Sequence, residues 1–152
     1  MRILVDTNVL LRRAQVTSAQ HLAARNSLQA LIEADTELCL LPHVVYKYWV
    51  AATRPTAVNG LGMAVKLVET AVAELLQDFV LLKDERGIFN HWRALVVVHS
   101  ILGKNAHDAR LVAAMQRHGV AHLLTFNGPD FARFPGIKVL SPAEIVAGRL
   151  PA

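Results

Sequence analysis

The sequence has a single cysteine, Cys39, among its 152 residues. One cysteine excludes a disulfide framework within the chain and any metal site built from several thiolates. Cys39 lies in the apolar segment Leu38–Leu41, which is typical of a buried thiol in a reducing compartment. We therefore expect a cytoplasmic protein.

Long hydrophobic segments are also missing. No stretch of about 18 residues is free of charged and polar interruptions, so we expect no membrane span. Asp6 interrupts the apolar amino terminus, which does not fit the hydrophobic region of a signal peptide. Charged residues make up only 18% of the chain and hydrophobic residues 53%, a composition typical of a globular protein. From this length we expect residues 1–152 to form one domain.

The charge pattern and the absence of two common motifs restrict the possible functions of the chain. The net charge of +4 and the pI of about 9.6 are compatible with an acidic or nucleic-acid partner, but no run of five basic residues forms a tail. Neither a glycine-rich phosphate loop nor a G-x-S-x-G nucleophile motif occurs. Seven basic residues are candidates for contacts with a nucleic acid, although scattered surface charge is the default interpretation: Arg12, Arg13, Arg54, Arg93, Lys104, Arg110 and Arg133.

Five short apolar segments predict strands, at residues 3–5, 37–41, 79–82, 121–124 and 137–140. Helical patterns separate them, at residues 10–15, 17–35, 42–54, 63–77, 88–101 and 106–118, with a last helix from residue 142. Strands that alternate with helices predict an α/β fold with a central parallel sheet and helices on both faces.

Some helices carry more specific expectations. Thr17 and Gln20 have the spacing of a capping box, so we expect a helix to begin there. Its apolar stripe is expected to contain Leu22, Leu28, Leu31 and Ile32. The helix at 88–101 is apolar enough to be largely buried, and residues 126–134 are expected to form a polar loop. His107 is expected to take part in capping the helix that follows residue 105.

Polar side chains at strand ends and helix starts are the candidates for chemistry. Asp6 follows the first strand, Asp108 lies at the start of a helix, and Asn127 and Asp130 follow the fourth strand. In a parallel sheet such positions meet at one edge, and carboxylates that meet there suit Mg²⁺ or Mn²⁺. The alternative is that each residue caps a helix or forms a turn, and for Asp130, in a Gly-Pro-Asp turn, this alternative is favoured.

Four segments together resemble a known family. They are ILVDTNVLL at residues 3–11, YKYWVAATRP at 46–55, GKNAHDARLVAAM at 103–115 and LLTFNGPDF at 123–131. In this order and spacing they resemble the PIN-domain nucleases, and within these the VapC-type toxins of bacterial toxin–antitoxin pairs. The resemblance covers nearly the whole chain.

The resemblance implies a three-layer α/β/α sandwich with a central parallel sheet of about five strands. It also implies an enzyme, a Mg²⁺-dependent endoribonuclease, with Mn²⁺ as the other candidate ion. The implied partners are an RNA substrate, a small cognate antitoxin and a second copy of the chain in a homodimer.

The resemblance also implies roles for individual residues. Asp6 and Asp108 match the metal-binding acids of the family, and Thr7, Asn8 and Thr125 match polar residues that support the site. Asn127 or Asp130 is expected either to hold a water molecule or to contact the metal ligands without binding the metal itself.

Lys47 departs from the family pattern, because it stands where these proteins usually have a glutamate. The fourth acidic position is an amide, Asn127. Two further hypotheses therefore stand beside the nuclease. The chain is a catalytically weakened PIN-fold module that binds RNA or antitoxin, or it is a phosphatase-like hydrolase with Asp6 as nucleophile, which lacks the second aspartate because Asn8 stands two residues on.

Overall fold

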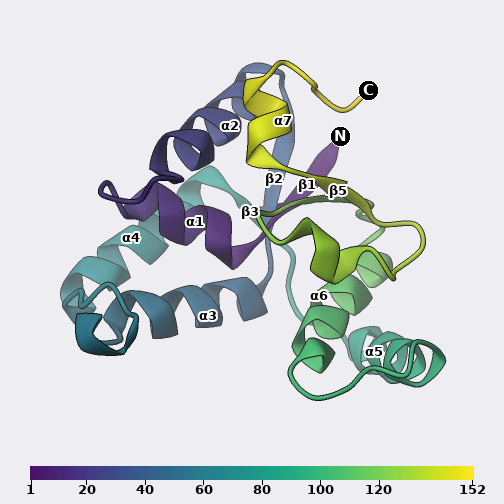
Figure 1. Cartoon of the computed structure of the whole chain (residues 1–152). Coiled ribbons are helices and arrows are strands. Elements are labelled where there is room, and N and C mark those ends of the chain that lie inside the picture. The colour runs from purple at the N-terminus through teal and green to yellow at the C-terminus, as the bar shows by residue number, and fades with distance from the viewer.

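A five-stranded, all-parallel sheet forms the centre of the protein (Figure 1). The computed structural model describes all 152 residues. The strands are β1 (Arg2–Val5), β2 (Glu37–Leu40), β3 (Val80–Leu81), β4 (His122–Leu124) and β5 (Lys138–Leu140). They are ordered β3-β2-β1-β4-β5, so the first strand lies in the middle of the sheet. All five predicted strands are present.

Helices cover both faces of this sheet. They are α1 (Thr7–Ala14), α2 (His21–Glu33), α3 (Pro42–Thr53), α4 (Val65–Asp78), α5 (Arg86–Val98), α6 (Asn105–His118) and α7 (Pro142–Val146), with 3₁₀ turns η1 (Thr56–Val58) and η2 (Gly128–Phe131). Helix α1 packs against α2 and α3, α3 against α4 and α2 against α7, whereas α5 packs against α6 on the other side of the sheet (Figure 1). This confirms the predicted three-layer α/β/α fold.

Strand β1 is buried on both faces because helices cover both. Ile3, Leu4 and Val5 have no exposed surface. The chain leaves β1 toward β2, crosses to β3, and then returns through α5 and α6 to β4 on the other side of β1. The carboxyl ends of β1 and β4 therefore border the switch point at which open α/β sheets bind ligands.

Local signals in the sequence set several helix ends. Pro42 occupies the first turn of α3, and Arg54, which precedes Pro55, leaves the helical region with a ψ of 139°. Gly119 ends α6 in the left-handed conformation with a φ of 69°. In α7, Ser141 and Glu144 form a reciprocal capping box.

The predicted capping box at Thr17 and Gln20 is wrong. Helix α2 begins at His21, and Gln20 makes no side-chain cap bond, because its Oε1 instead accepts a 3.2 Å hydrogen bond from Nε of Arg12. The predicted apolar stripe is confirmed for Leu28 and Leu31, which are buried, and is wrong for Leu22 and Ile32, which are exposed. Ala24 and Ser27 complete the buried face. Contact with α1 and α7, which the sequence pattern does not encode, determines the buried face.

Two other expectations need correction. Helix α5 is not largely buried, because it packs mainly on α6 and leaves Phe89, Val97 and Val98 exposed. Residues 126–134 are not simply a polar loop, because they contain the turn η2 and bury the side chains of Phe131 and Phe134. None of the helices combines the length and apolar character that crossing a membrane requires.

Candidate active site

Asp6 lies at the carboxyl end of β1 and begins α1. Its backbone N–H donates to the carbonyl oxygen of Leu124, which continues the pairing of β1 with β4. Its Oδ1 accepts a 2.7 Å hydrogen bond from the N–H of Thr7, so Asp6 caps the helix as the simpler interpretation proposed. Asp6 is only 5% exposed and still lines a cavity. Capping therefore orients Asp6 and leaves it available to a ligand.

Thr125, directly after β4, fixes the other oxygen of Asp6. The Thr125 hydroxyl donates a 2.8 Å hydrogen bond to Oδ2 of Asp6 and accepts bonds from Nδ2 of Asn8 and the N–H of Asn127. Asn8 also donates from Nδ2 to Oδ2 of Asp6 and accepts at Oδ1 from the N–H of Phe126. This network ties the ends of β1 and β4 together and holds the Asp6 carboxylate in one orientation.

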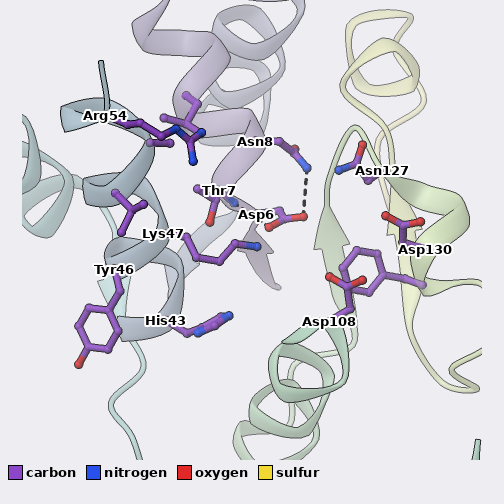
Figure 2. Close-up of a pocket in the computed structure, with 14 residues that line it drawn as sticks. Asp6, Thr7, Asn8, His43, Tyr46, Lys47, Arg54, Asp108, Asn127 and Asp130 are labelled. Atoms are coloured by element: carbon purple, nitrogen blue, oxygen red, sulfur yellow. Dashed lines mark hydrogen bonds between the residues drawn. The ribbon is translucent and has the colours of Figure 1, made fainter. Parts of the chain in front are cut away.

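The predicted site residues meet at one cavity of about 410 Å³ (Figure 2). Six of them line it: Asp6, Thr7, Asn8, Asp108, Asn127 and Asp130. Thr125 is 1% exposed and does not line the cavity, but its hydroxyl is bonded to Asp6, which does. Figure 2 shows the side chains of α3 on one side of the cavity and Asp108, Asn127 and Asp130 on the other. Tertiary structure thus brings together residues that the sequence separates by more than a hundred positions.

The acids of this cavity act on one another. Partial burial raises the pKa of Asp108 above its ordinary value, and the neighbouring charge of Asp130 raises it further, as does that of Asp6. Asp130 thus lies close enough to Asp108 to interact with it. The interpretation of Asp130 as a turn residue alone is therefore too narrow, since η2 carries its side chain to the cavity.

Lys47 extends from α3 into the same cavity toward Asp6 (Figure 2). Its charge acts to lower the pKa of Asp108, against the larger effect of burial. The ion pairs of the structure are Arg2–Glu37, Arg110–Asp84 and Arg117–Glu85, so Lys47 is in none of them. Lys47 therefore lies in the candidate site with an unpaired ammonium group.

The sequence analysis missed His43. This histidine lies one turn before Lys47 on α3, and its ring stacks on that of His107, with the ring centroids 6.2 Å apart. Burial lowers the pKa of His43 to about 4, helped by the charges of Arg110 and Lys47. His107 lies in the first turn of α6, where Lys104 holds the N-cap position. The four-residue spacing of His43 and Lys47 on one helix face was the signal that could have identified His43.

The donor set fits a hard divalent cation. Carboxylate and amide oxygens line the cavity, from Asp6, Asn8, Asp108, Asn127 and Asp130. However, no three His, Cys, Asp or Glu side chains are grouped closely enough to form a metal cluster by themselves. Mg²⁺ needs no such cluster, because it is usually held by one or two carboxylates together with water and substrate phosphates. A cation here would relieve the mutual repulsion of the acids.

Most of the scattered basic residues lie away from this cavity or are engaged elsewhere. Arg12 is bonded to Gln15 and Gln20, Arg13 lies over the ring of Phe79, and Arg110 pairs with Asp84. Arg54 does line the cavity, and Lys104 lines a neighbouring one. The basic groups near the candidate site are thus few and identifiable.

Comparison with known proteins identifies the family. The model of the PIN domain matches residues 3–137. No curated protein matches the sequence significantly. VapBC2 of Rickettsia felis, crystallised on a DNA fragment from its promoter, superposes with a TM-score of 0.70 at 12% identity over 93% of this chain and 98% of the other. VapBC of Salmonella typhimurium, bound to DNA, superposes with a TM-score of 0.68 at 15% identity over 93% of this chain and 98% of the other.

A third similar structure is VapC20 of Mycobacterium tuberculosis, a toxin that cleaves the sarcin–ricin loop. It superposes with a TM-score of 0.66 at 18% identity over 87% of this chain and 95% of the other. At these identities the superpositions show the fold. Together with the family match they confirm the resemblance that the four sequence segments suggested.

Proposed function

Because the chain belongs to the PIN-domain family, we propose that it is a Mg²⁺-dependent endoribonuclease that acts in the cytoplasm as the toxin of a toxin–antitoxin pair. The observation that carries the proposal is the meeting of Asp6 and Asp108 at one cavity on the switch point of the sheet. The net charge of +4 favours a polyanionic substrate.

Each residue has a distinct part in this proposal. Asp6 and Asp108 would hold the cation, with Mn²⁺ as a substitute for Mg²⁺. When bound, such an ion lowers the pKa of a water molecule and offsets charge on a phosphate. Thr125 and Asn8 orient the Asp6 carboxylate through their hydrogen bonds. Asn127 or Asp130 would hold a water molecule beside these ligands.

Two protein partners belong to the proposal. One is a small antitoxin, because VapBC complexes are among the similar structures. The other is a second copy of the chain. A homodimer would show a mass of twice 16.7 kDa in light scattering after size-exclusion chromatography.

A specific observation supports a second candidate, a PIN-fold module that binds RNA or antitoxin but cleaves poorly. Lys47 places an unpaired ammonium group in the cavity that would receive the cation. A positive charge there opposes metal binding. The nuclease and the binding module would have the same fold, but only the nuclease would cleave RNA efficiently.

Cleavage of a labelled pool of mixed RNA distinguishes them. The proposed nuclease cleaves with Mg²⁺, stops with EDTA, and loses its activity in Asp108→Asn. Asp78→Asn is a matched control, because Asp78 is an exposed acid at the end of α4 and does not line the cavity. Binding of RNA without any metal-dependent cleavage would favour the binding module.

A further inference from the structure

A second cavity adjoins the candidate active site. It has a volume of about 460 Å³ and shares Asp108 and Asp130 with the first cavity, along with His43 and Lys47. The remaining residues of its wall are Lys104, Asn105 and His107, at the start of α6. No apolar residue lines it. A hollow of this kind does not fit an apolar ligand or a hydrophobic side chain of a partner.

The basic groups of this second cavity have no protein partners. Neither Lys47 nor Lys104 belongs to any of the three ion pairs in the structure. No side chain caps the amino-terminal end of α6, where the N–H groups of Ala106 and His107 donate to the carbonyl oxygens of Gly103 and Lys104. The helix dipole adds a partial positive charge at this end. Apart from the two acids it shares with the active site, the wall of the cavity therefore attracts anions.

His43 supplies an independent indication of a ligand. Its Nε2 is buried and has no hydrogen-bond partner, although buried polar atoms are nearly always bonded. The imidazole lies in the wall shared by the two cavities and stacks on His107. The ring is therefore a polar part of the wall that a ligand of the second cavity would contact.

We propose that the second cavity binds a phosphate of the RNA substrate that neighbours the phosphate being cleaved, with Lys104 as its principal contact. This inference rests on the nuclease function proposed above and adds the position of a substrate phosphate to it. A phosphodiester carries one negative charge and exposed acceptor oxygens, which match an ammonium group, imidazoles and a helix amino terminus. Because the two cavities share a wall, the phosphate in the second cavity and the phosphate being cleaved would belong to adjacent parts of one RNA strand.

Lys47 and Lys104 have different positions in this arrangement. Lys47 lines both cavities, so its removal would also affect the site of the acids. Lys104 lines only the second cavity and lies on the exposed surface, four residues before Asp108. Lys104 is therefore the residue with which to test the second cavity alone.

The test is fluorescence anisotropy with a short, labelled, single-stranded RNA of mixed sequence in EDTA, over a range of salt concentrations. Each lost phosphate contact on a single strand reduces the slope of log affinity against log salt by about 0.7. We expect Lys104→Gln to bind several-fold more weakly at low salt with this smaller slope, and Lys104→Arg to keep the slope of the wild type. Lys66→Gln is the matched control, because Lys66 is an exposed lysine on α4 that lines neither cavity.

The outcomes separate this inference from the proposed function. If the wild type cleaves RNA with Mg²⁺ but Lys104→Gln keeps the full salt slope, the second cavity does not bind phosphate and the nuclease proposal stands. If the wild type neither binds nor cleaves RNA, both are overturned.

A second measurement tests which phosphate is bound. Once the cleaved bond is mapped, one neighbouring phosphate is replaced by a neutral methylphosphonate. This replacement should weaken binding to the wild type and have no further effect on Lys104→Gln. If the losses of binding free energy from the methylphosphonate and from Lys104→Gln are simply additive, Lys104 does not contact that phosphate.

Discussion

The hydroxyl of Thr125 donates a 2.8 Å hydrogen bond to Oδ2 of Asp6, across 119 positions of the sequence. Both side chains are almost completely buried, at 1% and 5% exposure. The bond joins the ends of the neighbouring strands β1 and β4, and the same hydroxyl accepts bonds from Asn8 and Asn127. Thr125 thus positions the acid without lining the cavity itself.

Thr125→Val should lower both stability and activity. Valine keeps the shape but leaves Oδ2 of Asp6 and two donors without this partner, which costs about 1–3 kcal/mol. Urea unfolding measures the loss of stability, and RNA cleavage at saturating Mg²⁺ measures the loss of activity. Thr125→Ser, which restores the hydroxyl, is the control. Wild-type stability in the valine variant would contradict the role of the network.

Asp108→Asn should weaken metal binding and raise the stability of the metal-free protein. Burial and the charge of Asp130 raise the pKa of Asp108, so its charged form is less favourable in the folded state than in the unfolded state. Neutralising it removes that unfavourable contribution at neutral pH. Calorimetry should show Mg²⁺ or Mn²⁺ affinity lower by about tenfold or more, or 1.4 kcal/mol.

Asp6→Asn should also weaken metal binding, but without the gain in stability, since Oδ2 of Asp6 accepts bonds from Thr125 and Asn8. Its fold should persist because the cap bond from Thr7 needs only one oxygen. Circular dichroism checks the fold of both variants. Unchanged metal affinity in both would exclude the assigned site.

Lys47→Glu should increase cleavage when Mg²⁺ is limiting. The change replaces an ammonium group in the cavity with a carboxylate, the residue type that the family resemblance leads us to expect at this position. A pair of unit charges 4 Å apart interacts by about 4 kcal/mol at an effective dielectric constant near 20, before flexibility and solvation reduce it. Initial cleavage rates across a Mg²⁺ titration measure the effect, and Lys66→Glu controls for the change in net charge. Equal rates at all metal concentrations would mean that Lys47 does not limit the site.

Gly60→Ala should destabilise the turn that follows α3. A Cβ at this position would lie 1.8 Å from the carbonyl oxygen of Arg54, which is backbone and cannot move aside easily. We expect a loss of about 1–3 kcal/mol in denaturant unfolding. Gly87→Ala is the contrasting variant, because there the Cβ meets only the flexible side chain of Arg117 and alanine favours helix α5. Equal effects of the two changes would disagree with this geometry.

Cys39 should be unreactive in the folded protein. Burial raises the pKa of its thiol to about 11, helped by the charge of Glu37, so little thiolate exists at pH 8. Ellman's reagent should label the native protein slowly and label one thiol promptly in denaturant. Rapid labelling of the native protein would place Cys39 at an accessible position, which the sheet does not allow.

The sequence by itself determined the strands, their helices and the fold class. Ile3, Leu4 and Val5 form a continuous apolar run, which is typical of a strand covered on both faces. Pro42 and Gly119 define helix ends through their backbone chemistry. The resemblance of four segments selected Asp6 and Asp108 as candidate metal-binding acids, and both lie at one cavity. These signals are local, so they can be read from the order of residues.

Tertiary structure alone decided what surrounds those acids. The shift of the buried face of α2 from Leu22 to Ala24, and the burial of Phe131 beside a polar turn, depend on contacts with distant elements. The stacking of His43 on His107, and the cavity they share with Lys104, arise because parallel strands bring the starts of α3 and α6 together. Sequence periodicity records the period of each helix, but not which distant helix its side chains meet.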